Sequence, residues 1–451
     1  MKDLTKGSIP KAIIGFMIPV FFGQLFQLFY SLVDTRIVGS TLGNDALAAV
    51  GATTTLNTLI IGFLVGLTNG FAVITAQNFG AGNKDRVRKS VALTLELGLG
   101  ISLVLTVVSL ALLPKILIWL NTPEEHLMHG YEYISVIIGG MTFAMLYNVC
   151  ASALRAIGDT VTPLLFLVFS TILNIFLDYG FIRGLHMGVE GAAYATVLSQ
   201  LIAFLLCIVY MFRKYEFLRL TKEDLAYHGA QDSTMARKML ATGISMGLMS
   251  SLVSLGTVAL QSSINTFGTN IIVAHTAARK VTELFMMPFA VMGMTMTTYC
   301  GQNLGAGQFS RIRQGIWWAL GLTWAWCALV LVAAHTISPW LVQLVTATKI
   351  TEVIETASWY LRVDTTLYFV TAIITVVRNS LQGIGDPITP IVSSFIELVG
   401  KVAAVFVLAP RLGYFGIILT EPIVWVLMVI PLILRILTMK EIRGDLMKKE
   451  I

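Results

Sequence analysis

Apolar residues dominate this chain in long runs that are separated by short polar segments. Twelve runs are each long enough for a membrane-crossing helix, which needs about 20 residues. They cover residues 12–36, 46–74, 90–113, 128–152, 162–183, 188–212, 239–266, 272–297, 312–336, 357–383, 388–408 and 415–437. The pattern predicts an all-α polytopic membrane protein with twelve transmembrane helices.

The composition supports this prediction. Of the 451 residues, 56% are hydrophobic and only 12% are charged, whereas about a quarter of the residues in a soluble domain are charged. Four cysteines, Cys150, Cys207, Cys300 and Cys327, lie in or beside the runs without paired spacing. We interpret them as small apolar residues rather than disulfide or metal ligands, and we expect no cofactor.

The basic residues predict the orientation, because Lys and Arg mark the cytoplasmic side of a membrane protein. With the N-terminus inside, the inner segments hold 22 of the 31 Lys and Arg residues and the outer loops hold five. Both termini are therefore expected in the cytoplasm. The net charge of +6 follows from this asymmetry and requires no nucleic-acid partner.

One motif occurs twice, 225 residues apart: "AQNFGAGNKDRVRK" at residues 76–89 and "GQNLGAGQFSRIRQ" at residues 301–314. A glycine-rich phosphate loop would follow a strand and open a helix in an α/β unit. Each copy instead follows an apolar run and ends in a basic cluster. We interpret the glycines as tight turns between helices on the cytoplasmic side.

A second pair of segments repeats at nearly the same distance. "ALRAIGDTVTP" at residues 153–163 matches "SLQGIGDPITP" 227 residues later. The repeats predict two homologous six-helix lobes, residues 1–225 and 226–451, that begin on the same side of the membrane. Parallel repeats of this kind are typical of alternating-access transporters, in which the substrate binds in a central cleft between the halves.

The doubled "QNxGAG", "VDTRIVG" at residues 33–39 and "NIFLDYGFIRGLHMGVEGAAYAT" at residues 174–196 resemble the multidrug and toxic compound extrusion (MATE) family, in its prokaryotic DinF-type branch. The resemblance covers essentially the whole chain, and the last motif is its most specific part. It implies an antiporter of the prokaryotic plasma membrane, not an enzyme, that exports cationic or amphipathic organic compounds. The implied coupling ion is H⁺ or Na⁺, and we expect a monomer.

Polar residues form a stripe on the first predicted helix. Gln24, Gln27, Ser31 and Asp34 are spaced 3, 4 and 3 apart and so share one face. Such a stripe faces the bundle interior or a water-filled cavity. The alternative for Asp34 is a helix-end position at the outer surface beside Arg36.

Two later runs add polar groups. Asn174 and Asp178 lie four apart and share a helix face, and Thr196 follows in the next run. Carboxylates, an amide and a hydroxyl are oxygen ligands for a small cation, and two neighbouring acids favour binding of a proton. The resemblance implies that Asp34, Asn174, Asp178 and Thr196 form the cation site. The alternative is that Asn174 and Asp178 only stabilise the packing of their helix against its neighbours.

The second half does not repeat this chemistry, because Asn174 and Asp178 correspond to Lys401 and Val405. Its own charges have helical spacing that allows mutual neutralisation. They are Arg279, Lys280 and Glu283 in one run and Glu397 and Lys401 in another. Glu421 has no visible partner. For Glu283, attraction of cationic substrates is the functional alternative.

Flexible methionines, and the aromatic rings of Phe29 and Tyr30, favour binding of varied aromatic cations. We expect the substrate path to include Gln24, Gln27, Tyr30, Ser31, Glu283 and Met287. For the methionines, Met287 among them, and for Phe29, a lipid-facing position is the alternative.

Other classes of membrane protein fit less well. A lipid-linked precursor flippase of the same superfamily would need a basic cavity for a pyrophosphate, whereas the polar stripe of the first half carries acids. A receptor or scaffold would need an output module, and the cytoplasmic segments are only short loops. A primary pump would need an ATPase domain, which we do not find in this sequence, so the chain could belong to such a pump only as a subunit.

Overall fold

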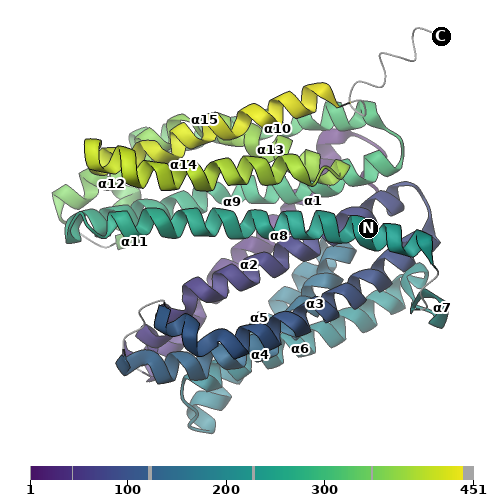
Figure 1. The fold of residues 1–451 in the computed structure, drawn as a ribbon, viewed down its shortest axis with the longest axis horizontal. Coiled ribbons are helices and arrows are strands. Elements are labelled where there is room, and N and C mark those ends of the chain that lie inside the picture. Colours follow the sequence, from purple (N-terminus) through teal and green to yellow (C-terminus); the bar gives the residue numbers. More distant parts are fainter. Residues whose placement is uncertain (1, 43, 120–123, 226–228, 347–348, 440–451) are drawn as a thin grey trace. The chain divides into compact units, whose positions relative to one another are not determined.

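The computed structural model describes residues 2–42, 44–119, 124–225, 229–346 and 349–439, apart from the side chains of Asp34 and some other helix residues. Every regular element in these ranges is a helix (Figure 1). The long helices are α1 (Ile9–Leu42), α2 (Asn44–Gly80), α3 (Lys84–Trp119), α4 (Glu124–Ala156), α5 (Val161–Tyr179), α6 (Val189–Lys214), α8 (Ala230–Ile264), α9 (Thr269–Gly305), α10 (Phe309–Thr336), α12 (Thr351–Thr366), α13 (Tyr368–Ile384), α14 (Ile388–Leu412) and α15 (Tyr414–Thr438). Shorter elements are a π-helical turn (Gly180–Gly184), a 3₁₀ turn (Glu216–Leu218), α7 (Lys222–Leu225) and α11 (Ser338–Thr346).

These helices confirm the predicted all-α membrane fold. Within the described ranges, eleven helices are long and apolar enough to cross a bilayer, and the bent pair of α12 and α13 makes twelve if it is counted as one span. Several helices are longer than the predicted apolar runs. The 37 residues of α9 span about 55 Å, whereas the hydrocarbon core of a bilayer is about 30 Å thick.

The span predicted at residues 357–383 is not one straight helix. It consists of α12 and α13, which meet at Leu367 with a bend of 52°. Neither Pro nor Gly lies within residues 357–382, so the sequence carries no signal for the break. At the bend the hydroxyl of Tyr368 donates to Oδ2 of Asp364 at 3.0 Å.

Contacts along the chain define two compact units. Unit 1 comprises Met1–Asp3 and Ile18–Gly247, and unit 2 comprises Leu4–Met17 and Leu248–Ile451. The divisions therefore fall inside α1 and inside α8, so that each of these helices begins in one unit and continues in the other. The halves 1–225 and 226–451 refer to the sequence duplication and stay a prediction.

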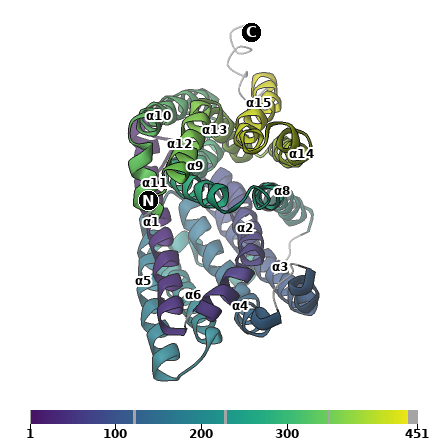
Figure 2. The ribbon, with the colours of Figure 1, turned by 90° about the vertical axis from the view of Figure 1, so that its left-hand side faces the viewer.

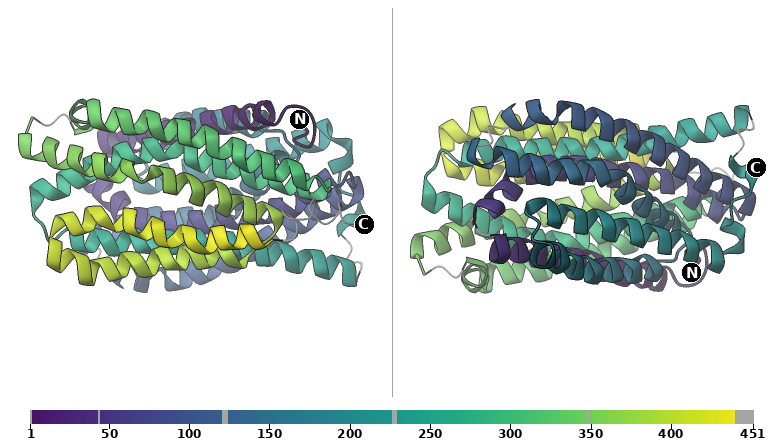
Figure 3. Two further views of the ribbon diagram at one scale, coloured as in Figure 1. Left: turned by 90° about the horizontal axis from the view of Figure 1, so that it is seen from above. Right: turned by 90° about the horizontal axis from the view of Figure 1, so that it is seen from below.

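Each unit has its own apolar core. In unit 1, Phe71, Ile134 and Met145 are fully buried, and α4 lies beside α6 (Figure 2). In unit 2, Ala278, Leu361 and Ile418 are fully buried, and α14 lies beside α15 (Figure 3). These cores position the polar helix faces that are described below.

The repeated glycine motif forms the same turn twice. The first glycine turn (residues 80–83) joins α2 to α3, and the second glycine turn (residues 305–308) joins α9 to α10. Gly82 and Gly307 have φ angles of +72° and +69°, a backbone region that favours glycine. The interpretation of these motifs as tight turns between helices is confirmed.

Candidate cation and transport site

Helix α5 is polar on its buried face and apolar on its exposed face. Asn174 and Asp178 are 1% and 0% exposed, whereas Phe176 between them is 70% exposed. Polar residues four apart share a helix face, and in a membrane helix that face turns toward the protein interior. Directly after Asp178 the helix changes into the π-helical turn Gly180–Gly184, a feature that is frequent at functional sites.

Asn174 lies between Asp178 and Thr196. With its amide oriented so that both ends find a partner, Nδ2 donates to Oδ2 of Asp178 at 3.0 Å and Oδ1 accepts from the backbone N–H of Thr196 at 3.2 Å. The same end of the amide lies 3.3 Å from Oγ1 of Thr196. The amide therefore links α5 to α6.

Tyr30 extends this network to α1. Its hydroxyl lies 3.2 Å from Oγ1 of Thr196, although the two residues are 166 positions apart in the chain. The sequence analysis placed Tyr30 in the substrate path. Nothing in the sequence predicted that Tyr30 would contact Thr196, a residue of the candidate cation site. The structure thus joins Tyr30, Thr196, Asn174 and Asp178 in one chain of polar contacts within unit 1.

This arrangement has the chemistry of a site for a proton or a small cation. A carboxylate, an amide oxygen and two hydroxyls are hard oxygen groups of the kind that small cations prefer. Protonation of Asp178 would make its carboxyl group a hydrogen-bond donor, and it would thereby change what the Asn174 amide can bind.

The other predicted residues of α1 lie in different environments. Gln24 is half-buried, and Gln27 and Ser31 are exposed. Asp34 lies within α1, but its side chain is outside the described residues. Of the predicted α1 set, Tyr30 contacts the α5–α6 cluster through its hydroxyl.

Glu283 and Met287 lie on α9 in unit 2. Glu283 is exposed and forms a 3.2 Å ion pair with Lys280, which is also exposed. Met287 is half-buried. The expected neutralisation of Glu283 by a neighbouring base on its own helix is present, and an exposed pair of this kind contributes little to stability.

A buried charge cluster lies elsewhere in unit 2. Nζ of Lys401 is 2.8 Å from Glu397 and 3.1 Å from Glu421, and Nη1 of Arg279 is 3.8 Å from Glu421. The predicted Glu397–Lys401 pair is therefore present, and Glu421 gains two basic partners. Such pairing lowers the cost of burying charge.

Asp364, in α12, is a buried acid that the sequence analysis did not single out. It is 1% exposed, and its Oδ1 has no hydrogen-bond partner among the described residues. A signal was available, because an acid inside the predicted run 357–383 is a functional candidate by default.

An all-α membrane fold with duplicated turns and a buried carboxylate–amide–hydroxyl cluster defines the class of this protein as a polytopic transporter. The MatE family model matches residues 19–180 and 245–407, one segment in each half of the sequence. The chain belongs to the MatE family, and the family resemblance found in the sequence is confirmed. As a member of a transporter family it is not an enzyme.

Several known proteins resemble the chain over most of its length. The probable multidrug resistance protein YoeA of Bacillus subtilis (strain 168) is 30% identical over 321 residues, which cover 69% of each chain. The FAD transporter of Shewanella oneidensis is 24% identical over 436 residues, 95% of each chain. A solved structure of a MOP superfamily transporter from Pyrococcus furiosus has a TM-score of 0.85 and 25% identity, and the match covers 96% of this chain and 97% of that chain.

Proposed function

We propose that this protein is an antiporter that couples inward movement of H⁺ or Na⁺ to the export of cationic or amphipathic organic compounds. The coupling site consists of Asp34, Asn174, Asp178 and Thr196. The observation that carries the proposal is the chain of polar contacts from the buried Asp178 and Asn174 to the half-buried Thr196 and Tyr30. Relatives that are named multidrug resistance proteins support the substrate class.

The contacts suggest how an ion would act. A proton or Na⁺ at Asp178 competes with the Asn174 amide for the carboxylate, because both bind the same oxygen atoms. Reorientation of the amide then alters its contacts with Thr196 and, through Tyr30, the packing of α1. Ion binding thereby changes the relative stability of two conformations, which is the requirement for alternating access.

We further propose that the chain resides in a prokaryotic plasma membrane as a monomer with both termini in the cytoplasm. The excess of Lys and Arg in the inner segments supports this orientation.

Ethidium efflux from intact cells tests the function. We expect faster efflux from cells with the wild-type protein than from cells with the empty vector. Asp178→Asn and Asp34→Asn should reduce the rate to the vector level, because an amide cannot exchange a proton or neutralise Na⁺. Replacement of Na⁺ in the medium identifies the ion, since only a Na⁺-coupled exporter slows.

Glu283→Gln is the matched control in the other unit. Its ion pair is exposed, so we expect a milder loss than in Asp178→Asn. Wild-type efflux in Asp34→Asn and Asp178→Asn, with both variants present in the membrane, would contradict the proposed coupling site. A greater loss in Glu283→Gln would assign coupling to unit 2.

A second candidate substrate class is an amphiphile with a pyrophosphate group, and a specific observation favours it. Nε of Arg378 is buried without a hydrogen-bond partner among the described residues, and its Nη1 lies 3.5 Å from Oγ of Ser394. A guanidinium with spare donors binds phosphate groups well. Since one relative is an FAD transporter, export of FAD from the same cells is the appropriate assay, and loss of that export in Arg378→Gln is the expected result.

A further inference from the structure

Residues on both sides of the second glycine turn bind the segment that precedes α1. Gln302 and Asn303, at the end of α9, are completely buried. The backbone N–H of Leu4 donates to Oε1 of Gln302 at 3.0 Å, and Nδ2 of Asn303 donates to the carbonyl oxygen of Leu4 at 3.3 Å. Leu4 itself is 0% exposed. Leu4 and Thr5 are thus buried in unit 2, whereas residues 6–8 are exposed.

Arg311, in the first turn of α10, completes this contact. Its Nη1 donates to the carbonyl of Gly7 at 2.9 Å, and its Nη2 donates to the carbonyls of Leu4 at 3.2 Å and Lys6 at 3.4 Å. Its Nε donates to Oδ1 of Asn303 at 3.2 Å. One guanidinium therefore binds three main-chain carbonyls between Leu4 and Gly7, and its planar fork of donors suits this task better than an ammonium group.

Residues 4–8, which Arg311, Gln302 and Asn303 contact, lead directly into α1. Residues 4–17 belong to unit 2, and from Ile18 onward the same helix belongs to unit 1. Farther along α1, Tyr30 contacts Thr196 of the candidate cation site. From Ile9 to Tyr30 the helix rises about 32 Å, and α1 continues over that length with Pro19 inside it.

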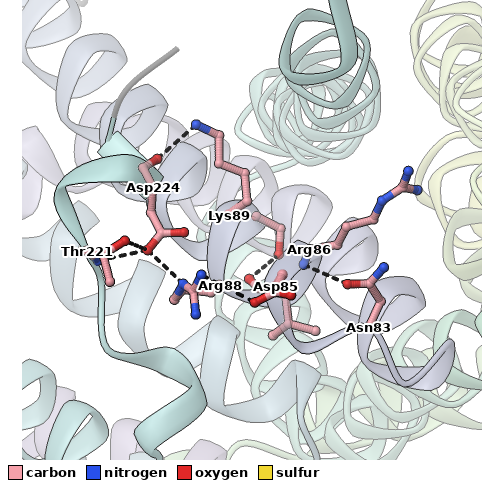
Figure 4. A network of polar contacts seen from close by, with 9 residues as sticks. Asn83, Asp85, Arg86, Arg88, Lys89, Thr221 and Asp224 are labelled. Carbon is pink, nitrogen blue, oxygen red and sulfur yellow. Dashed lines mark hydrogen bonds and ion pairs between the residues drawn. The ribbon is translucent and has the colours of Figure 1, made fainter. Parts of the chain in front are cut away.

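The first glycine turn has a corresponding role with different side chains. Nε of Arg88 lies 2.7 Å from Oδ2 of Asp224, and Nζ of Lys89 donates to the backbone carbonyl of Asp224 at 2.8 Å (Figure 4). Lys89 also pairs with Asp232, in the first turn of α8, at 2.9 Å. In both copies, basic residues after the glycine turn bind the segment that leads into a long helix. These helices are α1 and α8, and each of them begins in one unit and continues in the other.

We propose that Arg311 is a positioning residue for transport: with Gln302 and Asn303 it anchors the start of α1 to unit 2, so that a change at the cation site moves both units together. The proposal rests on the proposed function for the identity of that site. It assigns a role to the second "QNxGAG" motif beyond that of a turn.

The sequence duplication provides a matched control. Arg86 occupies the position 225 residues before Arg311, and its side chain is exposed. We therefore compare Arg311→Gln, Arg311→Lys and Arg86→Gln with the wild type in the full-length protein. Hydrogen–deuterium exchange of residues 4–17 reports on the contacts between Arg311 and the segment before α1. Ethidium efflux gives the Vmax and KM of transport.

In Arg311→Gln we expect exchange at residues 4–8 to become about tenfold faster, because their opening loses the guanidinium contacts. Vmax should fall about fivefold while KM stays within about twofold, since positioning affects a step after substrate binding. Arg311→Lys should retain part of Vmax, and Arg86→Gln should match the wild type in both measurements. Thermal unfolding of each variant distinguishes a loss of coupling from a loss of fold.

Two results would overturn the proposal. One is unchanged exchange at residues 4–8 in Arg311→Gln, which would show that Arg311 does not hold the segment. The other is faster exchange with wild-type Vmax, which would show that the anchor is not needed for transport.

If the wild type exports no ethidium, the proposed substrate class fails and a measurement without substrate decides the inference. Addition of Na⁺ or mild acid to the purified wild type should then change exchange at residues 302–308, and Arg311→Gln should abolish that change. Absence of the change in the wild type, or its persistence in the variant, would overturn the proposal.

Discussion

Asp159 begins the turn that leads into α5 and is the centre of a compact polar cap. Its Oδ1 accepts the backbone N–H of Thr162 at 3.1 Å, and its Oδ2 accepts the hydroxyl of Thr162 at 2.7 Å. Nζ of Lys214 and the hydroxyl of Tyr215, at the end of α6, donate to the same oxygen at 3.0 and 2.6 Å. One carboxylate therefore ties the start of α5 to the end of α6.

Asp386 is the counterpart of Asp159 in the second copy of the motif. It accepts the backbone N–H and the hydroxyl of Thr389 at 3.1 and 2.9 Å, and Nε of Arg435 in α15 lies 2.6 Å away. The base has changed from Lys to Arg while the cap is retained. The carboxylate is thus required by the helix start, whose N–H groups lack partners within the helix.

The ionisation of Asp159 sets the pH range in which its cap is effective. Burial opposes ionisation, but hydrogen bonds from Tyr215, Thr162 and Lys214 outweigh it and lower the pKa from 3.8 to about 2. Because the folded-state pKa is the lower one, the cap stabilises the fold fully above pH 3.8 and loses its contribution as the pH falls toward about 2.

We expect Asp159→Asn to lower the free energy of unfolding by about 2 kcal/mol at neutral pH. The deficit should be constant down to about pH 5 and should shrink toward about pH 3, where the wild-type carboxylate begins to take up a proton. Thermal unfolding of the purified wild type and variant, from neutral pH down to about pH 3, measures this difference in stability. Asp85→Asn, at a side chain that is 86% exposed, is the control, and a deficit in Asp159→Asn that is independent of pH would contradict the explanation.

At the scale of helices, glycines allow α2 and α8 to approach closely within unit 1. A Cβ on Gly70 would lie 2.4 Å from Cα of Gly243, and a Cβ on Gly66 would lie 2.5 Å from the carbonyl oxygen of Met246. On α8, Gly247 lies against the ring of Phe63 in the same way. Small residues four apart on facing helices are a recurrent means of association in membranes.

Gly70→Ala tests this crossing. The added methyl group meets backbone that cannot rotate away, so we expect a loss of about 1–3 kcal/mol in the free energy of unfolding. Gly100→Ala on α3 is the matched control, because no atom lies within 4 Å of its Cβ position; it should be neutral or stabilising by up to about 1 kcal/mol. Equal thermal unfolding temperatures for the two variants would argue against the close approach.

At the scale of the whole molecule, the duplication preserved backbone geometry and not side-chain chemistry. The glycine turns and aspartate caps occur in both copies, because turn sterics and unpaired N–H groups impose the same demands on each. The buried acid of α5 has no such constraint, and Val405 occupies the position that corresponds to Asp178. We infer that the two halves share a backbone scaffold but have different roles in transport.

The proposed orientation can be tested with introduced cysteines, because the four native cysteines are buried. Leu185 and Lys84 are exposed and are separated by three predicted spans. A membrane-impermeant maleimide should label Leu185→Cys in intact cells and should label Lys84→Cys only after permeabilisation. The opposite result would invert the proposed topology, and labelling of both variants in intact cells would contradict the number of spans between them.

The sequence by itself determined the helical membrane fold and several local features. The apolar runs predicted twelve spans because a bilayer requires about 20 apolar residues from each crossing helix. Glycines at repeated positions predicted Gly82 and Gly307 in turns, since backbone sterics are local. The four-residue spacing of Asn174 and Asp178 predicted their shared face, because the period of the helix is known in advance.

Only the tertiary structure decided which of these faces meet. Three contacts join residues that are distant in the sequence. They are the contact of Tyr30 with Thr196, the ion pair of Glu421 with Lys401 and the hydrogen bonds of Arg311 to the segment before α1. The bend between α12 and α13 likewise has no local signal. Helical periodicity specifies the direction of a side chain around its own axis, but its partner depends on how distant helices pack, and that packing is a property of the folded chain.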